Sequence, residues 1–159
     1  TVSMGPCRIN GNLSFGNNTT LTLDGTLYVT GNVTLGNSDT IRLHSSYTSL
    51  GGVLVSDGII DTGNGNTFMG SGHEKSYLLL LSTNTSDAAI TVSNNSSGAV
   101  FYTNAGGIEL SNGVSVIELT GYKVTMLPNS TIQYSSGVVN IFFSGGPGGG
   151  WSVTDWQEK

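Results

Sequence analysis

Asp57 and Asp61 come nearest to a catalytic pair in this sequence. Two carboxylates at a suitable separation can cleave a glycosidic bond, one as the acid and the other as the base or nucleophile. Both residues lie in turn-like sequences, however, because a glycine follows each of them within two positions. Aspartates in turns commonly cap backbone amide groups. We therefore interpret Asp57 and Asp61 as corner residues, and we predict no catalytic residue in the chain.

The cationic residues that a polysaccharide lyase needs beside its acidic substrate are spread thinly along the chain. The five are Arg8, Arg42, Lys75, Lys123 and Lys159. Glu109 and Glu118 alternate with apolar neighbours, which predicts that both lie on the solvent side of strand-like segments. The sequence therefore favours a protein that is not an enzyme. A carbohydrate-binding or polysaccharide-degrading protein is the alternative.

His73, Glu74 and Lys75 form a compact ionisable triplet within a glycine-rich loop. Such a triplet could bind a metal ion or a partner. The chain has only two histidines, His44 and His73, and their spacing matches no metal-ligand motif. We therefore interpret the triplet as a polar loop and expect neither a metal nor a cofactor. The single cysteine, Cys7, can form no intrachain disulfide and is expected to be a small buried residue.

Charge and hydropathy argue against two classes of partner. The formal net charge is -5 at pH 7, whereas nucleic-acid binding requires clustered cations. No apolar run approaches the roughly 20 residues that span a bilayer. We therefore expect neither nucleic-acid binding nor a membrane span within this chain.

The elements that position these side chains follow a six-residue repeat near the N-terminus. Three apolar pairs succeed one another at this interval: Leu21/Leu23, Leu27/Val29 and Val33/Leu35. Both side chains of a pair face one side of a strand, because strand side chains alternate. Glycine, aspartate and asparagine between the pairs suit sharp corners. Three such strands make a triangular turn of about 18 residues, so the sequence predicts an all-β, right-handed parallel β-helix, a solenoid whose turns stack at about 4.8 Å.

The repeat continues with interruptions to about residue 143. Insertions at corners are predicted at residues 44–52 and 61–75. Further core pairs are expected at Ile41/Leu43, Val53/Val55, Leu78/Leu80, Ile90/Val92, Ile108/Leu110, Ile117/Leu119, Val124/Met126 and Ile132/Tyr134, and a final group at Val139/Ile141/Phe143. With the insertions allowed for, the sequence predicts about seven short turns.

The C-terminal residues depart from this pattern. Residues 145–150 are glycine except for Pro147, and Trp151, Val153 and Trp156 follow. Solenoids cover their ends, since a last turn exposes both its core and its unpaired strand edges. We therefore predict one domain, with the parallel β-helix at residues 1–145 and a glycine-rich break followed by a tryptophan-containing cap at residues 146–159. The N-terminal end, with Val2 and Met4, carries no comparable cap and is the expected point of attachment.

Four segments together resemble one group of bacterial proteins: residues 5–9, 23–32, 121–124 and 143–156. They are similar to secreted β-helix domains of uncharacterised surface proteins that follow a type IV pilin-like or PilX-like pilus-assembly segment. The resemblance covers nearly the whole chain. It implies a secreted or cell-surface location and association with pili, and it implies no reaction. The hexads are also similar to those of bactofilins, whose β-helices polymerise end to end.

The remaining expectations concern partners. Candidate glycosylation sites in Asn-x-Ser/Thr sequences are Asn32, Asn84, Asn95 and Asn129. A surface of Ser, Thr and Asn with few charges suits glycans as modifications or as ligands. The sequence therefore predicts a non-catalytic extracellular structural or adhesive module. Its expected partners are other surface or pilus proteins, or further copies of itself that associate through the ends of the rod.

Overall fold

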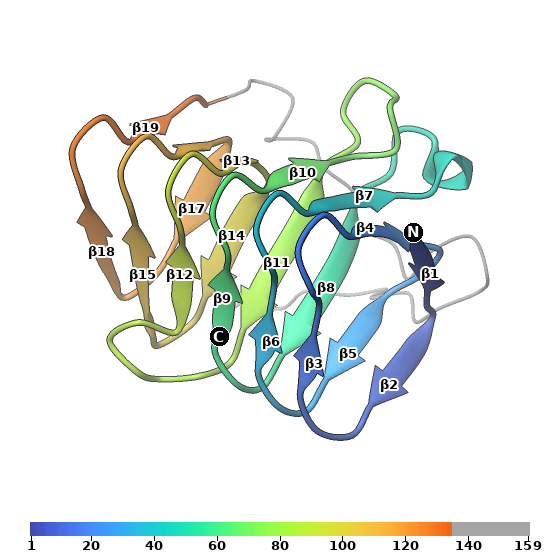
Figure 1. The fold of residues 1–159 in the computed structure, drawn as a ribbon, viewed down its shortest axis with the longest axis horizontal. Coiled ribbons are helices and arrows are strands. Elements are labelled where there is room, and N and C mark those ends of the chain that lie inside the picture. Colours follow the sequence, from blue (N-terminus) through green and yellow to red (C-terminus); the bar gives the residue numbers. More distant parts are fainter. Residues whose placement is uncertain (135–159) are drawn as a thin grey trace, which may run out of the picture.

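The structure is a computed structural model that describes residues 1–134. Its strands form three stacked parallel sheets, which we call sheets A, B and C (Figure 1). Sheet A consists of β1 (Val2–Met4), β4 (Thr20–Leu23), β7 (Thr40–Leu43), β10 (Thr67–Met69), β13 (Ser97–Gly98), β16 (Ser115–Val116) and β19 (Thr131–Ile132). Sheet B consists of β2 (Cys7–Ile9), β5 (Leu27–Val29), β8 (Gly52–Ser56), β11 (Leu78–Ser82), β14 (Val100–Thr103) and β17 (Glu118–Thr120). Sheet C consists of β3 (Leu13–Ser14), β6 (Val33–Thr34), β9 (Ile60–Thr62), β12 (Ile90–Val92), β15 (Gly107–Leu110) and β18 (Lys123–Met126).

Successive strands pass from sheet A to sheet B to sheet C, and each strand pairs with the strand three further along the chain. Figure 1 shows the chain rising through sheet C in front, crossing the top through sheet A and descending through sheet B behind, while it moves away from the N-terminus. This sense of rotation is right-handed. The predicted right-handed parallel β-helix is therefore confirmed, with six complete turns and the first strand of a seventh within the described residues.

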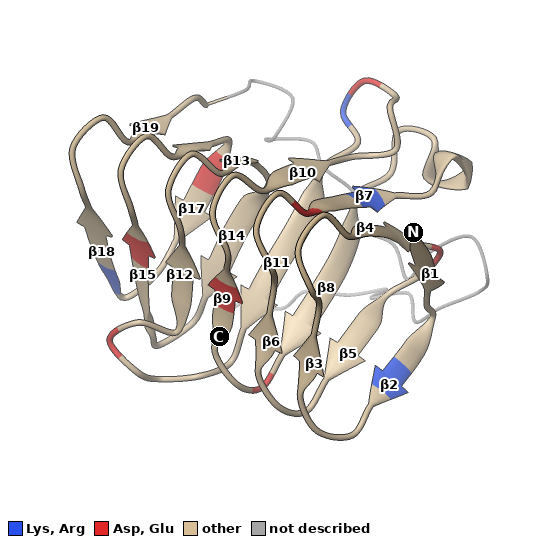
Figure 2. Ribbon diagram, viewed as in Figure 1, with Lys and Arg blue, Asp and Glu red and all other residues tan. Residues whose placement is uncertain are grey.

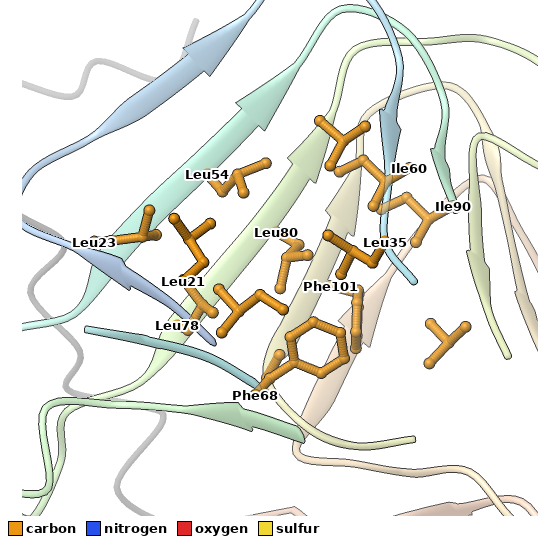
Figure 3. Close-up of a cluster of buried hydrophobic side chains, with 14 of the residues drawn as sticks. Leu21, Leu23, Leu35, Leu54, Ile60, Phe68, Leu78, Leu80, Ile90 and Phe101 are labelled. Atoms are coloured by element: carbon orange, nitrogen blue, oxygen red, sulfur yellow. The ribbon is translucent and has the colours of Figure 1, made fainter. Parts of the chain in front are cut away.

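The hexad pairs line the three inner sides of one turn, as predicted. The six side chains lie on β4, β5 and the segment that begins with β6, and none is more than 4% exposed. Leucine and isoleucine from successive turns stack on them in a continuous core (Figure 3). Deeper along the rod Phe68 and Phe101 meet edge to face, with ring centroids 5.6 Å apart. Such burial of apolar area is the main source of stability in a solenoid.

The length of a turn varies, which the hexads alone did not predict. Leu21 pairs with Ile41, a turn of 20 residues (41 − 21), whereas Ile60 pairs with Ile90, a turn of 30 (90 − 60). The added residues lie at corners. Residues 44–51 include the short 3-10 helix η1 (Ser45–Tyr47), and this insertion is confirmed. The predicted insertion at 61–75 is wrong in part, because β9 ends and β10 lies within it, and the inserted loop is residues 70–77.

Strand β8 faces the opposite way from the prediction. Leu54 is fully buried and pairs with Leu80, whereas Val53 and Val55 lie on the outer face of sheet B. Three apolar residues in succession give no alternation, so the sequence around Leu54 did not determine which face is inside. The pairing with β11 determines it, because Leu80 belongs to the core.

The last described strands expose several predicted core residues. Val124 and Met126 on β18 and Ile132 on β19 are 42%, 43% and 45% exposed, so these predicted core positions are not buried. Tyr134 is also exposed, at 62%, and on β16 Val116 is buried where Ile117 was expected. The predicted last core group, the predicted boundary at residue 145 and the predicted cap of Trp151, Val153 and Trp156 lie outside the described residues.

Candidate functional site

The corner between sheets C and A repeats one backbone conformation in every described turn. Its left-handed residues have φ between 58° and 69° and are Asn18, Ser38, Gly65, Asn95, Gly113 and Asn129. Asparagine and glycine adopt this conformation at lower cost than other residues, which explains the recurring Asn-Asn and Asn-Gly pairs. The chain thus makes the same sharp turn six times in one column along the rod.

Asparagine side chains connect these corners from one turn to the next. The Asn37 backbone N–H donates to Asn17 Oδ1 at 2.8 Å, and the Asn64 N–H donates to Asn37 Oδ1 at 2.9 Å. Further along, the Asn112 N–H donates to Asn94 Oδ1 at 3.0 Å. Each bond satisfies a backbone donor that a corner leaves outside the sheets. These asparagines therefore hold the stack together at its edge.

A second, buried column of polar side chains lies two residues further along three successive corners. Asp39, Asn66 and Ser96 are at most 1% exposed. Asp39 Oδ1 accepts from the Thr19 N–H at 2.7 Å, Asn66 Oδ1 accepts from the Asp39 N–H at 2.8 Å, and Ser96 Oγ accepts from the Asn66 N–H at 3.2 Å. The second Asp39 oxygen accepts from the Gly36 N–H at 2.8 Å. This buried carboxylate is therefore engaged by backbone donors, which makes it structural.

The outer face of sheet A carries a straight row of hydroxyl groups, one from each of six strands. The pairing register places Thr20, Thr40, Thr67, Ser97, Ser115 and Thr131 beside one another in that order. Among residues 1–134, none of these six side chains has a hydrogen-bond partner. Adjacent parallel strands lie about 4.8 Å apart, so the row is a regular array of free donors and acceptors on one face of the rod.

A hollow of about 390 Å³ opens at one side of this row. Arg42 and His44 line it from β7 and the residue that follows, and Met69 and Ser71 line it from β10 and the loop after it. The other lining residues are Thr22, Leu43, Ser45, Gly70 and Gly72. Its volume lies within the range of small-molecule sites.

Hydrogen bonds between the two inserted segments fix the walls of this hollow. Ser71 Oγ donates to the Thr48 carbonyl oxygen, and Ser76 Oγ donates to the Leu50 carbonyl oxygen at 2.8 Å. The Ser71 N–H in turn donates to Ser76 Oγ at 2.9 Å. The loop of residues 70–77 is thus tied to the segment of residues 44–51, so the hollow is formed before any ligand arrives.

Arg42 supplies a charge to this hollow that no carboxylate in the described part of the chain neutralises. Its Nε donates to Thr22 Oγ1 at 3.2 Å, and within residues 1–134 its guanidinium group takes part in no ion pair. Arg42 lies on β7, and Figure 2 shows the basic segment of β7 below a loop with one acidic and one basic segment. The His44 ring accepts at Nδ1 from the Ser46 N–H, which leaves Nε2 to donate. Both histidines of the chain, His44 and His73, lie in the hollow's lining or directly after it.

The predicted corner pair of Asp57 and Asp61 is not assembled as expected. Asp57 follows β8 at a corner, but it accepts from the Tyr28 hydroxyl and from Thr83 Oγ1 rather than from a backbone amide. This hydrogen bond is the main cause of a raised pKa at Tyr28, with burial and the charge of Asp57 adding to it and Arg8 opposing it. The Arg8 guanidinium lies 5.4 Å from the Tyr28 ring centroid.

Asp61 lies within β9 rather than at a corner, because the strand continues one residue beyond it. It shares a row on the outer face of sheet C with Thr91 and Glu109. Two strand spacings, about 9.6 Å, separate the backbones of Asp61 and Glu109. This alignment could not be predicted from the sequence because the register depends on the lengths of the insertions. The solvent-facing orientation predicted for Glu109 and Glu118 is confirmed on sheets C and B.

The candidate glycosylation sites differ in how free their side chains are. Asn32 Oδ1 accepts from the Ile59 N–H at 3.0 Å, and Asn84 Oδ1 accepts from the Ser86 N–H at 2.9 Å. Asn95 and Asn129 lie exposed at left-handed corners, and their side chains make no hydrogen bond within residues 1–134. If the protein is glycosylated, Asn95 and Asn129 therefore offer the less constrained acceptors.

Three further observations complete the chemistry of the described residues. No group of three or more His, Cys, Asp or Glu side chains in residues 1–134 is placed to hold a metal ion. No helix in the same part of the chain is long and apolar enough to cross a membrane. Cys7 is exposed in β2, so the prediction of a buried cysteine is wrong. Among the described strands, β2 is the edge strand of sheet B.

Comparisons with protein-family models, with curated proteins and with solved structures find no match to this chain.

Proposed function

We propose that this chain is a non-catalytic structural or adhesive module of an extracellular bacterial protein, located at the cell surface or associated with pili. The observation that carries the proposal is the pair of polar columns at the corner between sheets C and A. The side chains of Asn37, Asp39 and Asn66 are occupied in bonding backbone groups of neighbouring turns. An enzyme would direct such polar side chains at a substrate, whereas in this protein they stabilise the rod.

The repeated bonds make the rod stiff along its length. A hydrogen bond adds about 0.5–1.5 kcal/mol of net stability, whereas a buried polar group without a partner costs about 1–3 kcal/mol. A change of spacing between two turns would break the sheet pairing and both polar columns together. Such coupling suits a module that holds other parts of a surface protein at a set distance.

The ends of the rod supply the surfaces for association. Within residues 1–134, strands β1, β2 and β3 each pair with one neighbouring strand only, so the N-terminal edge of all three sheets has no further described strand beside it. Val2 on β1 is 37% exposed there. Unpaired edges of this kind add further strands readily. We propose that this edge joins the rod to another β-helical surface, in a surface or pilus protein or in a second copy of the chain.

Carbohydrate binding is the second candidate, and the outer face of sheet A favours it. The free hydroxyl row from Thr20 to Thr131 and the hollow beside Arg42 offer hydrogen-bond groups of the kind that recognise sugars. Adhesion to a glycan and a structural role are compatible, because they use different surfaces of the rod.

The proposal is tested in the native host with an antibody raised against the purified chain. We expect the antibody to label intact cells, and we expect in-frame removal of the chain to reduce attachment of the cells to a surface. The chain's measured activity on neutral and acidic polysaccharides, followed as newly formed reducing ends, should equal that of a heat-denatured control. Labelling that requires lysis of the cells, or steady release of reducing ends, would overturn the proposal.

A further inference from the structure

We propose that the hollow beside Arg42 binds a uronic acid unit of an acidic polysaccharide, whose chain continues along the hydroxyl row of sheet A. This proposal names a ligand for the adhesive part of the proposed function and rests on it. Positively charged side chains are scarce in this protein, since the whole chain has 5 Lys and Arg. One of them, Arg42, lines a preformed hollow and has no acidic partner among the described residues.

The geometry of Arg42 suits a carboxylate. Its Nε is held by Thr22 Oγ1, so the guanidinium group is oriented from one side while its two terminal nitrogens have no partner among the described residues. A guanidinium group presents paired donors that match the two oxygens of one carboxylate. No Asp or Glu within residues 1–134 lines the hollow. The site therefore offers a single positive charge, which fits one carboxylate better than the multiple charge of a phosphate cluster.

The other lining groups fit the remainder of a sugar ring. Ser45 carries a hydroxyl group that can donate to or accept from a sugar hydroxyl. Ser71 Oγ, whose own proton goes to the Thr48 carbonyl oxygen, can still accept from one. Met69 pairs with Arg42 on the adjacent strand and is 47% exposed, so it provides an apolar surface for the C–H face of a ring. A neutral sugar would leave the guanidinium group without its partner, so we expect selectivity for the acidic form.

The hydroxyl row extends the site beyond one sugar. Thr20, Thr40 and Thr67 precede Thr22, Arg42 and Met69 by two residues on the same strands, so both sets face outward side by side. The row then continues along sheet A to Thr131. An extended polysaccharide with a hydroxyl-bearing unit at each step can follow such a row. The overall charge of -5 works against general attraction of polyanions, so binding should depend on the local cation.

The test is a titration of the intact chain with tetragalacturonate, followed by changes in backbone amide NMR signals. We expect signals of residues 42–45 and 69–72 to shift, with those of sheet A shifting as the oligosaccharide lengthens. The methyl-esterified form of the same tetrasaccharide, which lacks the charge, should bind at least tenfold more weakly. The Arg42→Gln variant should lose at least tenfold in affinity for the acidic form, whereas the matched Arg8→Gln variant on sheet B should bind like the unchanged chain.

Two results would overturn the proposal: equal binding of the ester and the acid, or equal affinity of the Arg42→Gln variant and the unchanged chain. The thermal midpoint of Arg42→Gln confirms that the variant is folded, since Arg42 is an exposed residue outside the core. If the antibody labels intact cells and the chain supports attachment but binds no tetragalacturonate, this ligand is rejected and the structural role at the surface is kept. If the chain is found only inside cells but binds tetragalacturonate, the surface role is rejected and the binding site is kept.

Discussion

Tyr47 is a large side chain buried in the core without a partner for its hydroxyl group. It is 0% exposed, and its hydroxyl oxygen has no hydrogen-bond partner. A buried donor without a partner costs stability that an apolar residue of the same shape would not. We expect Tyr47→Phe to leave the free energy of unfolding unchanged or to raise it by up to about 1 kcal/mol. Urea unfolding followed by circular dichroism measures this, and Tyr28→Phe, which removes a bonded hydroxyl, should bring no gain.

The same residue makes stability depend on alkaline pH. Burial, aided by the charge of Asp24, raises the pKa of Tyr47 from 10.0 to about 12. Between these values the unfolded chain has lost the Tyr47 proton while the folded chain retains it, so stability falls as pH rises. Below about pH 10 this contribution is fully present. The Tyr47→Phe variant should show a flatter decline over this range, and an unchanged slope would contradict the assignment.

The positions of single residues were predictable only where the local sequence decides them. The inward-facing leucines at 21, 23 and 27 follow from alternation and appear as predicted. The exposure of Cys7 could not be predicted in this way, because it depends on β2 being an edge strand and not on the residues next to Cys7 in the sequence. Arg42 was recognised as one of few cations, but its isolation in a hollow required knowledge of which loops surround it.

At the scale of elements, the corner between sheets C and A offers a comparison of two asparagines that lie two residues apart. Asn66 is fully buried and bonds both the Asp39 N–H and the Gly36 carbonyl oxygen, whereas Asn64 is exposed. We expect Asn66→Ala to lower the free energy of unfolding by about 2–4 kcal/mol, because it leaves buried backbone groups unpaired. Asn64→Ala should cost less than about 1 kcal/mol, since water replaces the lost bonds.

Chemical unfolding of the two alanine variants under the same conditions measures this difference in the free energy of unfolding. Equal losses for Asn66→Ala and Asn64→Ala would show that the buried column does not stabilise the stack. The two variants serve as controls for each other, because both remove an asparagine from one corner and neither changes the left-handed residue Gly65 between them.

The elements themselves followed from the sequence wherever the six-residue interval was intact. Strands β4, β5 and β6 lie where the hexads predicted. The interval fails at β8 and β10, where the insertions change the length of the turn from 20 to 27 residues (54 − 27 for Leu27 and Leu54). The sequence of an insertion does not reveal which residues of the strands on either side of it will pair with the neighbouring turns. The face of β8 and the row containing Asp61 and Glu109 therefore became known only from the register.

At the scale of the whole molecule, the rod is a stack of nearly interchangeable layers. The contacts between turns are repeated by residues at equivalent positions: the Thr19 N–H donates to Asp39, and the Asp39 N–H donates to Asn66. Leu21 pairs with Ile41 and Val33 pairs with Ile60 in the same way. A solenoid of this kind gains its stability mainly from neighbouring layers. One layer should therefore be removable if the register of those that remain is kept.

Deletion of residues 21–40 removes one turn and joins Thr20 to Ile41, the residue that pairs with Leu21. The Thr19 N–H then meets Asn66 in place of Asp39, and Val2 meets Ile41 in place of Leu21. We expect a folded rod shorter by about 4.8 Å, measured by small-angle X-ray scattering, with the strand signal retained in circular dichroism. Deletion of residues 21–30 removes half a turn and places every later strand on the wrong side, so it should unfold the chain. If both deletions unfold the chain equally, the turns are not independent layers and the rod depends on the particular sequence of each one.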